Sequence, residues 1–396
     1  MTSPYARSIG VVFIAGCSLA LHAGKMPAAL PLIKAELDLT LSTAGVIVGM
    51  HAALSACCAL LCGLVVAKLG YARFAIAGVA LSGVGSLIGS HSPSLWPLMI
   101  SRVIEGAGWI LAVVSLPALM NSLSREKDRA LVMGIWGAFV PVGAGLMLLV
   151  SPLLLSIGGW RLSWMLAGGV SLLSAALLFW VCHANKQNLS SLSVLPTETP
   201  FVELRRPSVW WLAALFLLYS VQFGSVTVFL PTMLVDLTTV PLSAASYWVA
   251  LIMLINGIGN LLGGWLVGLG VARGQLIIVV CIVGGILSCL VYAPVEYAAI
   301  RIGSALLFSL VTGIIPGTVF ATIPVIASSA VSVGLIVAVV LQGIGIGQLI
   351  GPVAISAVVD GSNGNWAMGS LFILVTGVAM VATAVGLNSR LRRQIQ

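Results

Sequence analysis

Four charged residues lie inside stretches of sequence that are otherwise apolar. Arg102 and Glu105 stand three positions apart in ISRVIEGAGW (100–109), Lys25 lies in an earlier apolar stretch and Arg301 in a later one. A charge in the middle of a bilayer costs at least about 2.5–3.5 kcal/mol, so such residues nearly always face a partner or a cavity. Guanidinium groups bind carboxylates through two hydrogen bonds, and a desolvated glutamate can carry a proton. These residue types therefore predict anion binding and proton transfer.

Each of these residues also has a simpler interpretation. We predict that Arg102 holds an anionic or polar group of a solute and that Glu105 carries a proton, but the two could instead form a permanent ion pair that only neutralises itself. Lys25 and Arg301 add positive charge and favour a small anion as the solute. The alternative for both is that the side chain extends along the helix to place its charge at the outer membrane surface.

The elements that position these charges are predicted to be membrane-spanning helices. The chain has 396 residues, of which 60% are hydrophobic and 7% charged, against about 25% charged residues in a soluble protein. A crossing needs about 20 apolar residues, and in lipid the backbone must satisfy its own hydrogen bonds. We expect twelve helices: 9–31, 44–67, 75–91, 95–119, 130–157, 161–183, 208–231, 245–269, 275–292, 296–319, 329–358 and 365–387.

The basic residues predict how these helices are oriented. Most of the 18 lysines and arginines fall in loops on the side of the N-terminus, whereas Lys34 and Arg161 fall in loops on the other side. Because cytoplasmic loops carry the excess of positive charge, we expect a multi-pass protein of the prokaryotic inner membrane with both termini cytoplasmic. The net charge of +8 then reflects membrane orientation, and no nucleic-acid partner is expected.

The chain reads as two similar halves. The longest polar stretch, 184–207, separates an N-terminal six-helix bundle (1–183) from a C-terminal one (208–396). Shifting the second half by 200 positions places Gly63 on Gly263 and Pro152 on Pro352, among other matches, and a shift of 199 places Arg102 on Arg301. Parallel repeats of this kind occur in transporters that bind their solute between the repeats.

Four sequence stretches resemble motifs of the major facilitator superfamily. They are GLVVAKLGYAR (63–73), where Ala67 stands near the place of the usual acid, RVIEGAG (102–108), GAFVPVGAG (137–145) and GGWR (158–161). The last of these resembles the tight turn that enters the sixth helix of the family. The third resembles a motif associated with antiporters, although Val140 replaces its usual glycine. RALVMGIWGAFVPVGAG (129–145) is also similar to the cyanate and nitroimidazole transporter branch. The resemblance implies a secondary transporter that works by alternating access.

Glycine, proline and amide residues complete the predicted site. We expect two bent helices to meet between the halves, since small residues allow close helix contact and proline bends a helix; generic packing is the alternative. The hinge candidates are Gly137, Pro141, Gly143, Gly145, Gly343, Gly345 and Pro352. Gln222 and Asn256 are predicted to contact the solute, although such residues can also simply join helices. Six tryptophans are expected at the membrane interfaces, namely Trp96, Trp160, Trp164, Trp210, Trp211 and Trp366.

The predicted function is proton-coupled transport of a small, anionic solute by a monomer in the lipid bilayer. The alternative is efflux of drugs or metabolites by proton antiport. An enzyme is not expected, because no H-E-x-x-H or G-x-S-x-G motif is present, and the missing P-loop argues against direct use of ATP. No cofactor is predicted. A soft-metal site formed by Cys58, Cys62 and His51 is the alternative to packing, but we interpret the cysteines as packing residues and predict no metal site.

Overall fold

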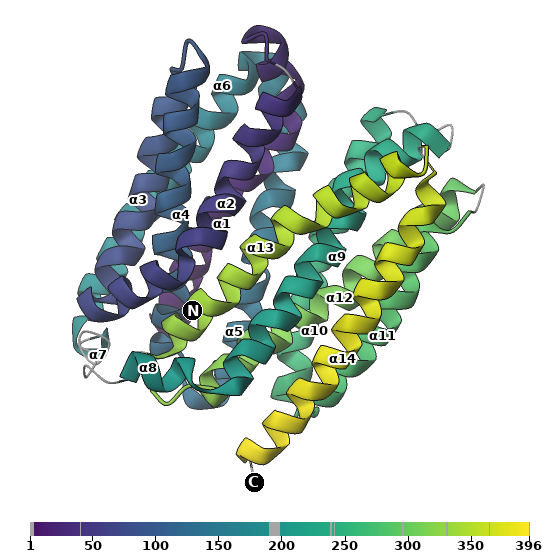
Figure 1. The fold of residues 1–396 in the computed structure, drawn as a ribbon. Coiled ribbons are helices and arrows are strands. Elements are labelled where there is room, and N and C mark those ends of the chain that lie inside the picture. The colour runs from purple at the N-terminus through teal and green to yellow at the C-terminus, as the bar shows by residue number, and fades with distance from the viewer. Residues whose placement is uncertain are drawn as a thin grey trace.

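The chain folds into helices throughout the part that the structure describes, which confirms the predicted all-α class (Figure 1). The computed structural model describes residues 4–39, 41–189, 199–237, 240, 242–294, 297–329, 332–363 and 365–395. The N-terminal helices are α1 (Pro4–Glu36), α2 (Leu41–Leu69), α3 (Tyr71–Ser90), α4 (Leu95–Leu123), η1 (Glu126–Asp128), α5 (Arg129–Gly137), α6 (Phe139–Ala184) and α7 (Lys186–Leu189). They are followed by α8 (Thr199–Leu204), α9 (Pro207–Leu237), α10 (Leu242–Gly268), α11 (Arg273–Tyr292), α12 (Ala298–Ile326), α13 (Ser332–Gly361), η3 (Trp366–Met368) and α14 (Gly369–Ile395).

The helices have the length and composition of a multi-pass membrane protein. Ten segments of the described residues are long and apolar enough to cross a membrane, and Ala53–Leu69 is a shorter apolar helix. One of the ten, Glu126–Ala184, has 59 residues, which at about 1.5 Å per residue is far more than one crossing of a roughly 30 Å core. The segment must therefore turn back, and the twelve predicted crossings stay a prediction in their exact number.

Two interruptions divide this long segment. Gly158 and Gly159 have non-helical dihedral angles, and Gly159 has a φ of 62°. Residues with a Cβ adopt this conformation only at a cost in free energy. This is the turn that the GGWR stretch predicts. A second interruption lies at Ala138, between α5 and α6. Pro141 has no N–H to bond to the carbonyl of Gly137 four residues earlier, so the bend predicted around Pro141 has its physical cause here.

A carboxylate fastens this turn to the end of the first helix. Glu36 accepts hydrogen bonds from Trp160 Nε1 at 2.7 Å and from Arg161 Nη1 at 2.6 Å, and Arg161 Nη2 also donates to Ser92 O at 3.1 Å. The hydrogen bonds from Trp160 and Arg161 hold the pKa of the Glu36 carboxyl below its ordinary value. Three separate parts of the N-terminal half are thus joined at one polar point.

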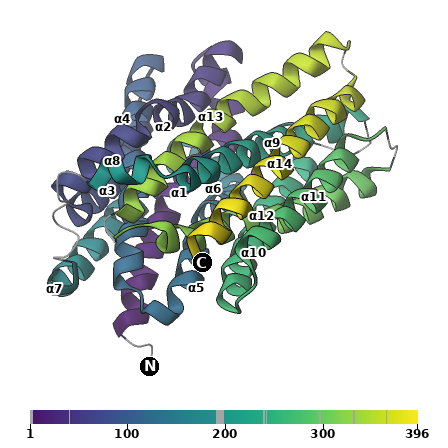
Figure 2. The same cartoon turned by 60° about the horizontal axis from the view of Figure 1, so that its bottom comes forward.

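The helices gather into two groups that meet along two lines of contact. Figure 1 shows α1–α4 and α6 on one side and α9–α14 on the other. Across the boundary α13 packs against α2, while α5 packs against α10 and α12, which Figure 2 shows from another side. The boundaries 1–183 and 208–396 stay a prediction, and residues 190–198 of the predicted linker lie outside the described residues.

Close contacts between the two groups lie at the end of the molecule that carries α8, here called the linker end. A Cβ added at Gly63 of α2 would lie 2.5 Å from the Ala338 Cβ of α13, and one added at Gly264 of α10 would lie 2.6 Å from the Gly134 Cα of α5. In Figure 1 the ribbons of the two groups approach each other at the linker end and diverge toward the opposite end. The halves are therefore pressed together at one end.

The linker end also holds the short helix α8 against the C-terminal half. Glu203 of α8 is fully buried and accepts hydrogen bonds from the backbone N–H of Ser328, at 2.8 Å, and from the Ser328 hydroxyl. Arg206 donates to the carbonyl of Ile326 at the end of α12. This part of the linker is thus attached to the loop between α12 and α13.

Candidate functional site

A buried group of charges occupies the middle of the N-terminal half, and we call Lys25, Arg102, Glu105 and His22 the buried charge cluster. Lys25 Nζ lies 2.5 Å from Glu105 Oε1, and Arg102 Nη1 forms an ion pair with Glu105 Oε2. Lys25 and Glu105 are 0% exposed, and Arg102 is 2% exposed. Both oxygens of the one carboxylate are therefore held by cations, and the contact with Arg102 is the i,i+3 ion pair that the sequence left open as the alternative to separate roles.

The lysine fixes the state of the neighbouring histidine. Lys25 Nζ donates to Glu105, to Ser86 Oγ at 2.6 Å and to His22 Nδ1 at 3.1 Å. When Lys25 is an ammonium group, which has three donors and no acceptor, His22 Nδ1 is the acceptor of this contact. The ring is then neutral with its proton on Nε2, which donates to Ser171 Oγ at 2.9 Å. All three donors of the lysine are in use.

Four helices contribute to this arrangement. His22 and Lys25 come from α1, Ser86 from α3, and Arg102 and Glu105 from α4. From α6 come Ser171 and Trp164, whose ring lies 4.3 Å from Lys25 Nζ and supports the ammonium by a cation–π contact. Gly85 and Gly89 allow α3 to approach this site, since an added Cβ at Gly85 would lie 2.9 Å from Glu105 N and one at Gly89 would lie 2.7 Å from Trp164.

The buried charge cluster has one more positive charge than it has negative charges. Two cations share one carboxylate while His22 is neutral, and Arg102 Nε is buried without a hydrogen-bond partner among the described residues. Removing one partner of a buried ion pair typically costs 3–5 kcal/mol, because it leaves an uncompensated charge. A proton on Glu105 would have the same effect on both cations, so protonation must be accompanied by movement or by a new anionic partner.

The predicted solute contact Asn256 belongs to a separate polar group in the C-terminal half. Asn256 of α10 donates to Tyr219 Oη of α9 at 3.3 Å and to Ser309 O of α12 at 3.1 Å. Asn260 Nδ2 donates to Asn256 Oδ1 at 3.0 Å. Asn260 Oδ1 is buried without a hydrogen-bond partner among the described residues, and a Cβ added at Gly137 of α5 would lie 2.6 Å from it. This amide therefore faces the N-terminal half.

Gln222 and Arg301, the other two predicted solute contacts, lie apart from both groups. Gln222 Nε2 reaches Ile373 O of α14 at 3.4 Å. Arg301 donates to the carbonyls of Val291, at 2.6 Å, and Ala293, at 2.8 Å. These carbonyls end α11, where cations are favoured by the unpaired carbonyl groups. This capping accounts for the burial of Arg301 and differs from the ion pair that Arg102 forms with Glu105.

The hinge candidates divide between the boundary and the interiors of the halves. Gly137 meets Asn260, and an added Cβ at Gly145 would lie 2.6 Å from Leu254 of α10, so both lie at the boundary. Gly143 instead faces Cys17 of α1, and Gly343 faces Ala213 of α9. Gly345 and Pro352 lie in α13, which continues as a helix from Ser332 to Gly361. A hinge role for these residues stays a prediction.

Sequence reasoning missed several residues of the buried charge cluster. His22, Ser86 and Ser171 were not predicted, although the three-residue spacing of His22 and Lys25 places both on one helix face. The interfacial position of the tryptophans stays a prediction. Trp160 and Trp164 are 2% and 0% exposed, whereas Trp96 and Trp210 are 72% and 50% exposed. Trp160 Nε1 donates to Glu36 at the end of α1, and the ring of Trp164 lies 4.3 Å from Lys25 Nζ.

A family model connects this architecture with known proteins. The model described as Major Facilitator Superfamily matches residues 11–339 of the chain, which includes the buried charge cluster. The chain belongs to this superfamily. It is therefore a transporter of the membrane and not an enzyme. Alignment with a solved major facilitator transporter, FucP in the outward conformation, gives a TM-score of 0.75 with 16% sequence identity and covers 97% of this chain and 99% of that one.

Curated relatives of the superfamily match part of the chain. The inner membrane transport protein YajR of Escherichia coli K12 is 28% identical over 138 residues, 35% of this chain and 30% of its own length. The methylenomycin A resistance protein of Streptomyces coelicolor is 26% identical over 163 residues, 41% of this chain and 34% of its own length. The galactose-proton symporter of Escherichia coli K12 is 28% identical over 165 residues, 42% of this chain and 35% of its own length. The chain thus aligns with about a third of the length of these relatives.

Proposed function

We propose that this major facilitator protein is a proton-coupled symporter of a small anionic solute, with Glu105 as the proton-binding group and Arg102 as the anion-binding group. The proposal depends above all on one observation, the double ion pair in which Lys25 and Arg102 hold the two oxygens of Glu105. When these ion pairs open, Glu105 can bind a proton in place of its cations, and Arg102 can bind an anion in place of the carboxylate.

The electrostatics of the cluster favour symport. When Glu105 binds a proton, Lys25 and Arg102 lose their shared partner in a buried site, and an anionic solute can replace it. When the anion binds Arg102, Glu105 loses one of its cations and accepts a proton more readily. Each ligand thus strengthens binding of the other, as linkage requires. The unpartnered Nε of Arg102 offers the guanidinium a second donor for a carboxylate.

The proposed transport cycle follows from the contacts at the linker end. With that end cytoplasmic, as the positive-inside rule predicts, the contacts Gly63–Ala338 and Gly134–Gly264 close the cytoplasmic side. The solute enters from the opposite side, and the halves rock about the boundary to release it. We propose further that the protein acts as a monomer in the bacterial inner membrane, in keeping with YajR as an inner membrane relative. Asn256, Gln222, Lys25 and Arg301 remain proposed solute contacts, of which Asn256 lies nearest to an amide that faces the boundary.

Transport in proteoliposomes tests the proposal. Small organic and inorganic anions, with galactose and fucose as neutral controls, are screened for thermal stabilisation of the wild type and of Arg102→Ala. The anion that stabilises only the wild type is then used for transport. Glu105→Gln should abolish accumulation driven by a pH gradient while keeping solute exchange, because glutamine resembles the protonated acid. Glu36→Gln, at the end of α1, is the matched control. Undiminished proton-driven accumulation in Glu105→Gln contradicts the role of Glu105.

Proton antiport is the second candidate, favoured by the methylenomycin A resistance relative. The same vesicles distinguish the two directions, because solute uptake carries protons inward in symport and outward in antiport. A lumen that becomes alkaline during uptake of the solute would establish antiport.

A further inference from the structure

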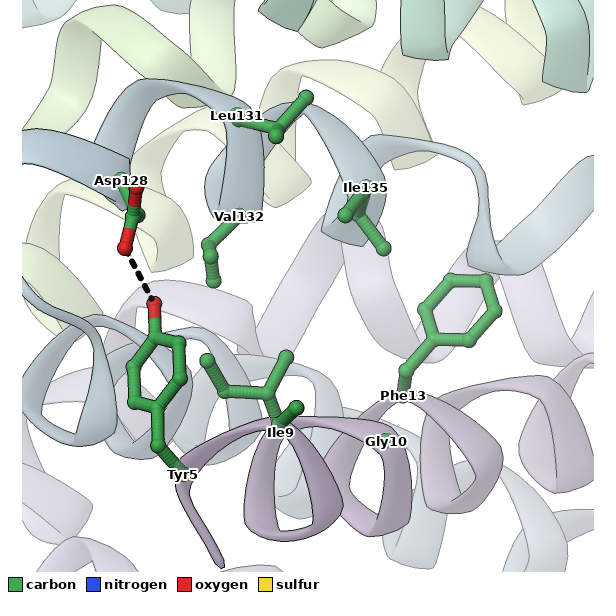
Figure 3. A pocket seen from close by; sticks show the side chains of 9 residues that line it. Tyr5, Ile9, Gly10, Phe13, Asp128, Leu131, Val132 and Ile135 are labelled. Carbon is green, nitrogen blue, oxygen red and sulfur yellow. Dashed lines mark hydrogen bonds between the residues drawn. The ribbon is translucent and has the colours of Figure 1, made fainter. Parts of the chain in front are cut away.

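A cavity between the first and fifth helices, away from the buried charge cluster, suggests a second binding site. Its volume is about 340 Å³. In Figure 3, Tyr5, Ile9 and Phe13 of α1 face Leu131, Val132 and Ile135 of α5 across this space. Asp128 stands at one end, where its carboxylate accepts a hydrogen bond from Tyr5 Oη at 3.4 Å. We call this space the α1–α5 groove.

The lining of the groove matches a hydrocarbon chain. Ile9, Val132 and Phe13 supply apolar surface, and Leu131 beside them is 41% exposed. The lining residues of α1 extend from Tyr5 to Phe13, so the groove follows two turns of the helix, about 12 Å. An apolar groove of this length on a membrane protein suits part of an acyl chain.

Gly10 keeps one wall of the groove open. It lines the groove, and a Cβ added there would meet no atom within 4 Å. Close helix contact explains a glycine at Gly143, whereas Gly10, like Gly169 and Gly303, has no such contact among the described residues. A larger side chain at position 10 would therefore extend into the groove.

Charge at the end of the groove selects the kind of lipid. Tyr5 and Asp128 mark this end, and the guanidinium of Arg125 lies 4.9 Å from the Tyr5 ring. Other cations lie close to this end in the sequence: Arg7 is two residues after Tyr5, and Lys127 and Arg129 flank Asp128. Together with Arg125 we call them the basic edge. Glu126 and Asp128 are the acids of the same stretch, and Asp128 is already engaged by Tyr5. Four cations against two acids give these residues a net positive charge.

We infer that the α1–α5 groove binds an anionic glycerophospholipid, with an acyl chain beside Gly10 and the phosphate group at the basic edge. Basic residues next to an apolar membrane segment attract anionic headgroups in this way. The site is distinct from the solute site, since its lining residues contribute nothing to the buried charge cluster.

The test compares two lipids that share their acyl chains. The purified full-length protein, stripped of lipid in detergent, is titrated with palmitoyl-oleoyl phosphatidylglycerol or with the corresponding phosphatidylcholine, and bound lipid is counted by native mass spectrometry. The wild type should bind phosphatidylglycerol more tightly. Gly10→Leu should fill the groove and weaken binding of both lipids by about tenfold or more, because the acyl chain is displaced. Arg125→Gln should lower the preference for phosphatidylglycerol roughly fivefold.

Gly303→Leu is the matched control, because a Cβ added at Gly303 of α12 likewise meets no atom within 4 Å. This variant should bind both lipids as the wild type does. Equal binding of the two lipids by the wild type would overturn the headgroup assignment. Wild-type binding by Gly10→Leu, or equal losses in Gly10→Leu and Gly303→Leu, would overturn the groove as the site. The melting temperature without lipid checks that each variant is folded.

Discussion

The contact between Gly264 of α10 and Gly134 of α5 permits a direct test of how the halves move. An alanine at 264 would place its Cβ 2.6 Å from the Gly134 Cα, whereas ordinary contact begins near 3.4 Å. Gly264→Ala therefore pushes the helices apart by about 0.8 Å. Overpacking of this kind costs about 1–3 kcal/mol, and the cost applies only while the linker end is closed.

This cost translates into a change of populations. A difference of about 1–3 kcal/mol changes the ratio of two states roughly 5- to 150-fold, so Gly264→Ala should favour the state that is open at the linker end. The gain in helix propensity from alanine is the same in both states and cancels. If the closed state predominates in the wild type by less than this factor, the open state becomes the major one.

Pulsed electron paramagnetic resonance measures the outcome. Spin labels replace His91 and Tyr297, which are exposed at the opposite end in different halves, in a background where the seven cysteines are serine. The variant should show a larger population with a short distance between these labels. Gly169→Ala in α6, where an added Cβ meets no atom within 4 Å, is the control. An unchanged distance distribution in Gly264→Ala would refute rocking about this contact.

Two further predictions concern stability. Lys25→Met leaves the Arg102–Glu105 pair intact, whereas Glu105→Gln leaves two buried cations without their carboxylate. We expect a lower melting temperature for both variants. The loss of folding free energy should be larger for Glu105→Gln, at about 3–5 kcal/mol or more. Equal losses would contradict the shared carboxylate. Because the pKa of Glu36 is lowered in the folded protein, Glu36 contributes to the free energy of unfolding at pH values above the ordinary pKa of glutamate. This contribution is lost as the pH falls through the lower pKa of the folded state. Since Glu36 and Arg161 are 44% and 36% exposed, the loss of folding free energy should be below about 1 kcal/mol. Acid should therefore lower the melting temperature of Glu36→Gln less than that of the wild type. Glu126→Gln is the control.

The sequence predicts elements well where the physical cause is local. Apolar runs of sufficient length predict the helices, and the glycine pair in GGWR predicts the turn at Gly158 and Gly159 because only local backbone freedom is involved. The Arg102–Glu105 pair follows from i,i+3 spacing on one helix. In each of these cases the interacting groups are close in sequence.

Features that depend on how helices assemble were harder to predict. The sequence does not pair Lys25 with Glu105, because the two residues lie on different helices and are 80 positions apart. Ser86 and Ser171 are uncharged polar residues, and His22 is not charged at neutral pH by its residue type alone. The three come from three different helices, so no pattern along the chain brings them together. The internal repeat matches Arg301 to Arg102 but says nothing of what each one contacts: Arg301 binds the carbonyls at the end of α11, whereas Arg102 pairs with Glu105.

The attachment of α8 by Glu203 determines where the polypeptide can be cut. Since this carboxylate binds Ser328, the piece of chain from residue 199 onward travels with α12 and α13. A gene divided just before residue 199 should yield two polypeptides that reassemble into a working carrier. Division after Arg206 would instead leave Glu203 on the fragment that lacks Ser328.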